Sequence, residues 1–142
     1  MYKRQVSAGA PGFLSKSITV RAMQEQTGDI HHIVPKDYLA KHGYPDRGDY
    51  NQVANYVLTE TPINIAISNR PPHQYMSDVL TQIQTGVLKL GEIADEDELR
   101  RNYVQNAIPE ELPQVGAADY PTFLDRRRKL MAGYIKKYYQ AL

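Results

Sequence analysis

DIHHIVPKDYL, which spans residues 29–39, is the stretch from which the expected fold is built. Its first part, 29–34, predicts a short strand, because it is largely apolar and is followed by Pro35. Proline cannot donate a hydrogen bond to a sheet, and it suits the first turn of a helix. We therefore expect a strand and then a helix, with two adjacent histidines, His31 and His32, inside the strand.

Short helical pieces and turns are predicted after this strand. The first helix passes through Leu39 and closes at Gly43, and residues 43–49 form a turn cluster. Asp49 is expected to cap another short helical piece. The residues expected to point inward from that piece are Val53 and Ala54.

A second strand and a further helix follow. Residues 56–60, YVLTE, alternate enough in polarity to form a strand. Thr61 and Pro62 have the order of a helix cap followed by a proline at the first helical position. We expect this helix over 62–69, ending before the prolines at 71–72.

The second half of the chain predicts helices. Asp95 and Glu98 have the spacing of a capping box, residues 106–120 predict a loop, and a last helix begins at about Pro121. The apolar stripe before the capping box is Met76, Val79, Leu80, Ile83 and Val87. The stripe of the last helix is Phe123, Leu124, Leu130, Met131, Tyr134, Ile135 and Tyr138.

The expected fold class is α+β, a small two-stranded unit wrapped by helices within one domain. A short helix is expected from Ser17 or Thr19 to Met23. The three parts are an N-terminal lead-in with this helix over 1–28, the strand-containing core over 29–70 and a helical C-terminal part over 71–142.

Composition narrows the classes of function. The 142 residues are 42% hydrophobic and 23% charged, which predicts a packed core. The chain has no cysteine, which excludes disulfides, thiol nucleophiles and Cys-ligated metal sites. The net charge is +1, so any nucleic-acid contact must come from a local basic patch. With no long apolar run and no leader, we expect no membrane contact and a cytoplasmic location.

Several polar residues lie in or near the apolar segments. A histidine pair in a strand commonly has one ring in the core and one in solvent, but here Asp29 precedes the pair and asparagines follow. An amide inside an apolar segment must find hydrogen-bond partners or lower stability. A buried asparagine usually holds backbone groups, and this reading stays open for Asn55. The asparagines are Asn55, Asn64 and Asn69.

The strings DIHHIVPKDYL, ANYVLT and NIAISNRPP together resemble the HNH nuclease motif of the ββα-metal, or His-Me finger, superfamily. His32, Asn55 and Asn64 would take its three signature positions, with asparagine replacing the last histidine. The eight residues between the two asparagines match the family's short spacing, and the 22 after His32 would hold an inserted helix. Residues 12–76 resemble, more narrowly, the HNH domain of GmrSD-type DUF262/DUF1524 restriction proteins, and FLDRRRKLM resembles their tail.

The resemblance implies a core of two short antiparallel strands and a helix, surrounded by further helices, that hydrolyses DNA. His32 would be the general base, since an imidazole with a pKa of about 6.5 accepts a proton at physiological pH. His31 and the amide oxygen of Asn64 would hold a divalent cation, and Asn55 would support the loop around the base. Mg²⁺ is expected in cells by its abundance, and Mn²⁺, Ni²⁺ or Co²⁺ suit the mixed ligands.

Neighbours on a regular strand point to opposite faces, so His31 and His32 would flank one phosphate only where the strand ends or twists.

Two supporting residues, Asp29 and Asn69, have open roles. Asp29 either orients a histidine through a ring N–H or is exposed at the start of the strand. Asn69 either caps a helix end or contacts the site.

Basic residues offer contacts to the substrate. Arg70 lies a few residues past Asn64 and is the best candidate for a phosphate contact, and Lys36 is the second. The cluster 126–129, with the lysines at 136–137, is either a solvated helix face or a contact to the DNA backbone.

The resemblance also implies partners and a setting. DNA, modified or unmodified, would be cut in a restriction or phage-defence protein. A DUF262, ParB-like nucleotide-hydrolysing domain or subunit would be the partner. The alternatives are an inactive nucleic-acid-binding module with the same fold, a module that docks a partner through its helical half, and a purely structural domain.

Overall fold

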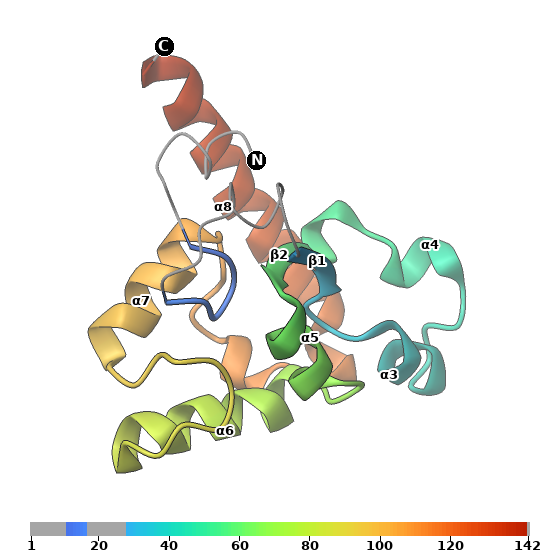
Figure 1. The fold of residues 1–142 in the computed structure, drawn as a ribbon. Helices are drawn as coiled ribbons and strands as arrows, with labels where there is room; N and C mark the ends of the chain where they lie inside the picture. Colours follow the sequence, from blue (N-terminus) through green and yellow to red (C-terminus); the bar gives the residue numbers. More distant parts are fainter. Residues whose placement is uncertain (1–10, 17–27, 142) are drawn as a thin grey trace.

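The computed structural model describes residues 11–16 and 28–141 (Figure 1). The helix expected from Ser17 or Thr19 to Met23 therefore lies outside the described residues. The strands and helices are β1 (Gly28–His32), α3 (Lys36–Lys41), α4 (Arg47–Tyr50), β2 (Tyr56–Glu60), α5 (Thr61–Ile67), α6 (Pro72–Thr85), α7 (Glu96–Gln105) and α8 (Tyr120–Ala141). The 3-10 turns are η1 (Val53–Asn55), η2 (Leu112–Gln114) and η3 (Ala117–Asp119). This confirms the α+β class, and none of the described helices has the length and apolar character needed to cross a membrane.

β1 and β2 form a two-stranded antiparallel sheet. In its register His31 pairs with Val57 and His32 pairs with Tyr56. The strand predicted over 29–34 ends at His32, two residues early. The N–H of Ile33 still donates at 2.8 Å to the backbone oxygen of Asn55, the next residue opposite it in the register, but Asn55 belongs to the 3-10 turn η1 rather than to β2.

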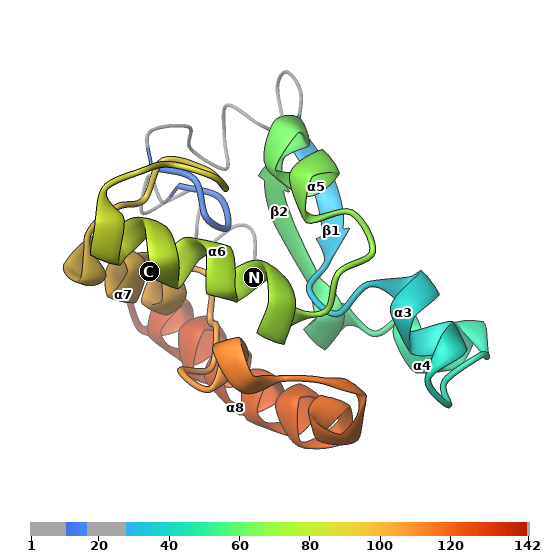
Figure 2. The same cartoon turned by 90° about the horizontal axis from the view of Figure 1, so that it is seen from below.

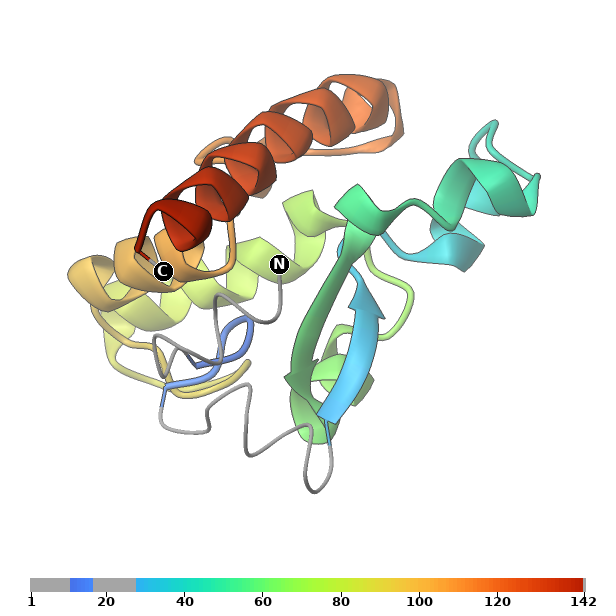
Figure 3. The same cartoon turned by 90° about the horizontal axis from the view of Figure 1, so that it is seen from above.

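The connection between the strands holds more helix than expected. α3 and α4 lie beside one end of the sheet, away from α6 and α7 (Figures 2 and 3). Asp46, not Asp49, is the N-cap residue of α4, and Asp49 lies within the helix. In η1 Ala54 is buried as expected, whereas Val53 is exposed because the tight turn directs Ala54 and Asn55 inward.

α5 follows β2 without a loop and covers one face of the sheet (Figure 2). Pro62 lies in its first turn, where a missing backbone N–H has no cost. The helix ends at Ile67, earlier than the predicted 69. Ser68 has a φ of +55°, which breaks the helical conformation before the prolines are reached.

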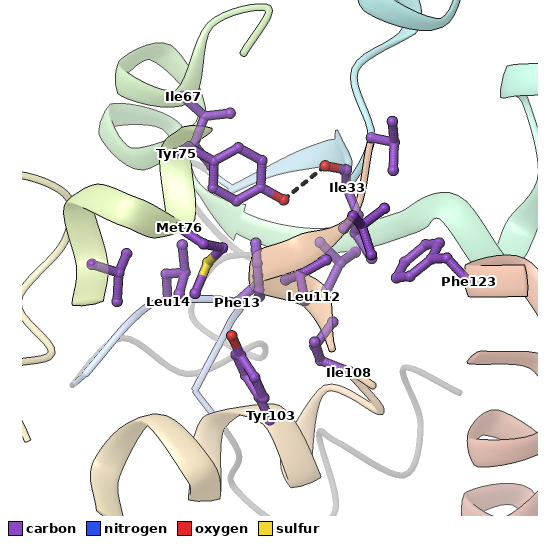
Figure 4. Close-up of a cluster of buried hydrophobic side chains, with 14 of the residues drawn as sticks. Phe13, Leu14, Ile33, Ile67, Tyr75, Met76, Tyr103, Ile108, Leu112 and Phe123 are labelled. Atoms are coloured by element: carbon purple, nitrogen blue, oxygen red, sulfur yellow. Dashed lines mark hydrogen bonds between the residues drawn. The ribbon is translucent and has the colours of Figure 1, made fainter. Parts of the chain in front are cut away.

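The core lies between the sheet, α6, α7 and the start of α8 (Figure 4). Tyr75 of α6 is fully buried, and its hydroxyl donates to the backbone oxygen of Ile33 at 2.7 Å. Phe13 of the N-terminal segment 11–16 packs in the same cluster. Tyr75 thus ties α6 to the point where the chain leaves β1.

Parts of the predicted apolar stripes are not in the core. Leu80 is exposed, and Val87 lies beyond the end of α6 because Gly86, with a φ of +75°, terminates that helix. On α8, Leu130 and Ile135 are also exposed. The spacing therefore identifies helices correctly but overstates how much of each stripe other elements cover.

Candidate functional site

β1 and α5 bring His31 and Asn64 together. His31 lies on the sheet face that α5 covers, and its Nδ1 is 2.8 Å from Oδ1 of Asn64. The imidazole is 3% exposed. Phe13 stacks on it with ring centres 6.1 Å apart, and Tyr75 contacts it edge-on at the same distance. Three elements and the segment 11–16 therefore fix this ring.

The hydrogen bond to Asp29 fixes which end of the Asn64 amide faces His31. Nδ2 of Asn64 donates to Oδ2 of Asp29 at 3.1 Å, and a carboxylate only accepts hydrogen bonds. The amide oxygen must then face His31, whose Nδ1 is the donor. Asp29 is half-buried and contacts the amide rather than a histidine ring. It therefore orients the partner of the histidine.

The environment of His31 keeps the imidazole neutral. Burial lowers the pKa of His31 from 6.5 to about 4, the hydrogen bond to Asn64 opposes this, and the charge of His32 adds to it. At neutral pH the ring has a free lone pair and no charge. Its Nε2 is buried and has no hydrogen-bond partner among the described residues.

The two atoms in this contact are of kinds that can act as ligands of a divalent cation. A neutral imidazole nitrogen and an amide oxygen are accepted ligands of Mn²⁺, Ni²⁺ and Co²⁺. Their separation of 2.8 Å would let both contact one ion at about 2.1 Å only after the ring proton moves from Nδ1 to Nε2, because a protonated nitrogen has no lone pair for a metal. No group of three or more His, Cys, Asp or Glu side chains with metal-binding geometry occurs among residues 11–16 and 28–141.

His32 lies on the opposite face of β1 and is half-buried. Its Nε2 is 2.9 Å from Oδ1 of Asn51, a residue just past the end of α4. The rings of Tyr56 and Tyr50 contact it edge-on, with ring centres at 5.1 and 6.3 Å. The two histidines thus have separate surroundings, as strand geometry requires.

Asn55 is fully buried and holds the backbone next to His32. Its Oδ1 accepts the N–H of Val34 at 2.8 Å, and its Nδ2 donates to the oxygens of Val34 at 3.0 Å and Tyr50 at 3.2 Å. These bonds join the chain after β1 to the last residue of α4. Both segments that flank His32 are therefore fixed by one side chain.

The remaining candidates are either exposed or engaged with other residues. The guanidinium of Arg70 pairs with Asp78 at 2.7 Å and donates to the backbone oxygens of Ala66 and Ile67 at the end of α5. Lys36 is exposed in the first turn of α3, and Asn69 is exposed just past α5. Among the described residues, no hydrogen bond joins Lys36 or Asn69 to the His31–Asn64 contact.

The basic cluster of α8 has one buried arginine between two exposed ones. Arg127 is fully buried, so the expectation that the whole cluster forms one solvated or DNA-contacting face is wrong. Its guanidinium lies in the protein interior, where it donates to backbone oxygens of the η1 region and of residues 106–107. Arg126 pairs with Glu111 and Arg128 with Asp125, so both are partly neutralised at the surface.

Sequence reasoning missed Asn51 and the two tyrosines around His32. Asn51 lies in a polar turn segment, where asparagine is common for local reasons, and no spacing marks it. Comparison of the chain with protein-family models, curated proteins and solved structures finds no match. The case for a function therefore depends on the contacts described above.

Proposed function

We propose that this chain is a metal-dependent HNH endonuclease that hydrolyses DNA phosphodiester bonds. The observation that supports this most is the 2.8 Å contact between His31 of β1 and Asn64 of α5. It joins the two residues to which the resemblance assigns the cation. The ββα arrangement of β1, β2 and α5 around that contact agrees with the core that the same resemblance implies.

In this proposal each residue has one task. His31 and Asn64 hold the cation, and Asp29 keeps the amide oxygen of Asn64 turned toward it. The bound cation would stabilise negative charge on the phosphate and on the leaving oxygen as a Lewis acid. His32 is the general base, and Asn55 keeps the backbone on both sides of it in place.

The reaction adds one water molecule across a P–O bond. The water oxygen bonds to phosphorus, and His32 accepts one of its protons. The bond from phosphorus to the 3′ oxygen breaks, and that oxygen takes a proton from solvent. The products are a 3′-hydroxyl and a 5′-phosphate, and His32 returns to its neutral state by releasing the proton to water.

The proposed partners follow from the same resemblance. DNA is the substrate, and a DUF262, ParB-like nucleotide-hydrolysing domain or subunit is the partner in a restriction setting. Arg70 and Lys36 are the proposed phosphate contacts. For Arg70 this requires the guanidinium to exchange its pairing with Asp78 for a phosphate oxygen.

The test is nicking of supercoiled plasmid by the purified chain with Mg²⁺, Mn²⁺ or Ni²⁺, and with EDTA. We expect metal-dependent nicking that His32→Ala lowers by about a hundredfold or more, since general-base catalysis contributes about 10²–10⁴-fold. His42→Ala is the matched control, because His42 is exposed at the end of α3 and should leave the rate unchanged. Nicking by folded His32→Ala at the wild-type rate would reject the proposal.

An inactive module with the same fold is the second candidate. The engagement of Arg70 by Asp78 and the end of α5 favours it, because the best candidate for a phosphate contact is already paired. This candidate predicts that DNA binding is retained, that no metal ion gives nicking, and that His32→Ala changes neither.

A further inference from the structure

We propose that Asn51 is the positioning residue of His32 and fixes the ring proton on Nε2, which leaves Nδ1 as the atom that accepts a proton. The catalytic meaning of this inference rests on the proposed function. The position of the ring proton itself is a property of the folded chain and can be measured without any activity.

The direction of the hydrogen bond determines the tautomer. Oδ1 of Asn51 lies 2.9 Å from Nε2 of His32. An amide oxygen only accepts, so Nε2 must carry the proton and donate it. In the neutral ring only one nitrogen is protonated, and the lone pair is then on Nδ1.

The ring is also held from its sides. Tyr56 contacts it edge-on with an interplanar angle of 84°, and Tyr50 does so at 62°. Edge-to-face contacts of this kind restrict rotation of the imidazole about its bond to the strand. Asn51 therefore acts on a ring whose plane is already defined, and it selects which nitrogen is protonated.

Asn51 itself is held in place, although it is exposed. Tyr50, its neighbour, has its backbone oxygen bound by Asn55 at 3.2 Å. The hydroxyl of Tyr120, from α8, donates to the backbone oxygen of Asp49 at 2.6 Å. The end of α4 is thus fixed to the core of the protein, and Asn51 has a defined position relative to β1.

Two substitutions separate the acceptor from the shape of the side chain. Asn51→Asp keeps an acceptor oxygen at the same position, and Asn51→Leu removes it at similar volume. Gln84→Leu replaces an exposed amide on α6 and serves as the matched control. Circular dichroism and urea unfolding establish that each variant is folded.

The first readout is a long-range ¹H–¹⁵N spectrum of His32 at a pH where the ring is neutral. The wild type, Asn51→Asp and the control should show the Nε2–H form, with an Nε2 proton that exchanges slowly with water. In Asn51→Leu that proton should exchange about tenfold faster, as expected for one lost hydrogen bond, and the ring should approach the tautomer mixture of free imidazole. A wild-type ring protonated on Nδ1, or an unchanged spectrum in Asn51→Leu, would overturn the inference.

The second readout is the nicking assay with Mn²⁺. Asn51→Leu should lower kcat by about 10–100-fold with little change in KM, and Asn51→Asp should retain most of kcat. Wild-type kcat in Asn51→Leu would overturn the catalytic part of the inference. If the wild type itself does not cut DNA, the proposed function fails, while the spectra still decide whether Asn51 sets the ring proton.

Discussion

His31 lies beneath Phe13 with 3% of its surface exposed, whereas His32, the next residue, is half-buried between two tyrosine rings. Strand geometry produces this difference, because successive side chains point to opposite faces of the sheet. One imidazole can therefore stay neutral inside the protein while the other remains open to solvent. A ligand role for the first and a base role for the second could serve one phosphate only at the end of β1, which stops at His32.

Burial of His31 predicts a dependence of stability on pH in the absence of metal. The pKa of His31 is about 4 in the folded protein and 6.5 for an ordinary histidine, so the unfolded chain binds more protons between these values. Its contribution to stability is complete above pH 6.5 and is lost as the pH falls toward 4. The free energy of unfolding should therefore fall by about 2 kcal/mol more in the wild type than in His31→Gln between pH 7 and 4.5.

Urea unfolding in EDTA at these two pH values measures the difference. His42→Gln, at an exposed histidine, should keep the wild-type dependence on pH. Equal losses of stability in the wild type and in His31→Gln would show that the His31 ring is not held neutral by burial.

At the scale of elements, β2 and α5 could be predicted well because their signals are local. YVLTE has the alternation of a strand, and a proline after Thr61 marks the first turn of a helix. The placement of α4 could not be predicted, because Asp46 and Asp49 are equally good cap residues in sequence. Only packing of the segment against α3 and the sheet distinguishes the two.

Arg127 shows why the role of a charged residue in a helix is not visible in the pattern. It lies in a run of four basic residues, yet it is the one that the fold buries. Its guanidinium donates to the backbone oxygens of Ala107, Ala54 and Asn106. It thereby joins α8 to the turn that carries Asn55.

Replacing Arg127 should destabilise the protein strongly. Arg127→Met removes the donors and leaves buried carbonyl oxygens unsatisfied, which should lower the free energy of unfolding by about 3–5 kcal/mol. Arg126→Met is the matched control at the neighbouring exposed position and should cost about 1 kcal/mol or less. Urea unfolding compares the two, and equal losses would contradict the role of Arg127 as the link between α8 and η1.

At the scale of the whole molecule, the His31–Asn64 contact depends on segments far from it in sequence. Asn102 of α7 accepts the N–H of Leu14 at 2.9 Å and donates to the oxygens of Gly12 and Ser15 at 3.0 Å each. These bonds hold the segment that places Phe13 on the His31 ring. A contact between residues almost ninety positions apart leaves no local pattern.

The candidate site was therefore predictable only in part. Residue types and spacing single out His32, Asn55 and Asn64, because such polar residues are unusual in apolar segments. The orienting contact of Asp29 to Asn64 and the place of Asn51 beside His32 depend on how α5 and α4 pack on the sheet. Such packing is not encoded in the spacing of residues along the chain.

The metal dependence of plasmid nicking tests the central claim most directly. The rate is measured against Mn²⁺ concentration for the wild type, Asn64→Ala and the exposed-amide control Gln84→Ala. Asn64→Ala should raise the half-maximal Mn²⁺ concentration by about tenfold or more, since it removes one of two protein ligands, and the control should match the wild type. Identical Mn²⁺ dependence in wild type and Asn64→Ala, or no nicking by the wild type with any metal ion, would contradict the account.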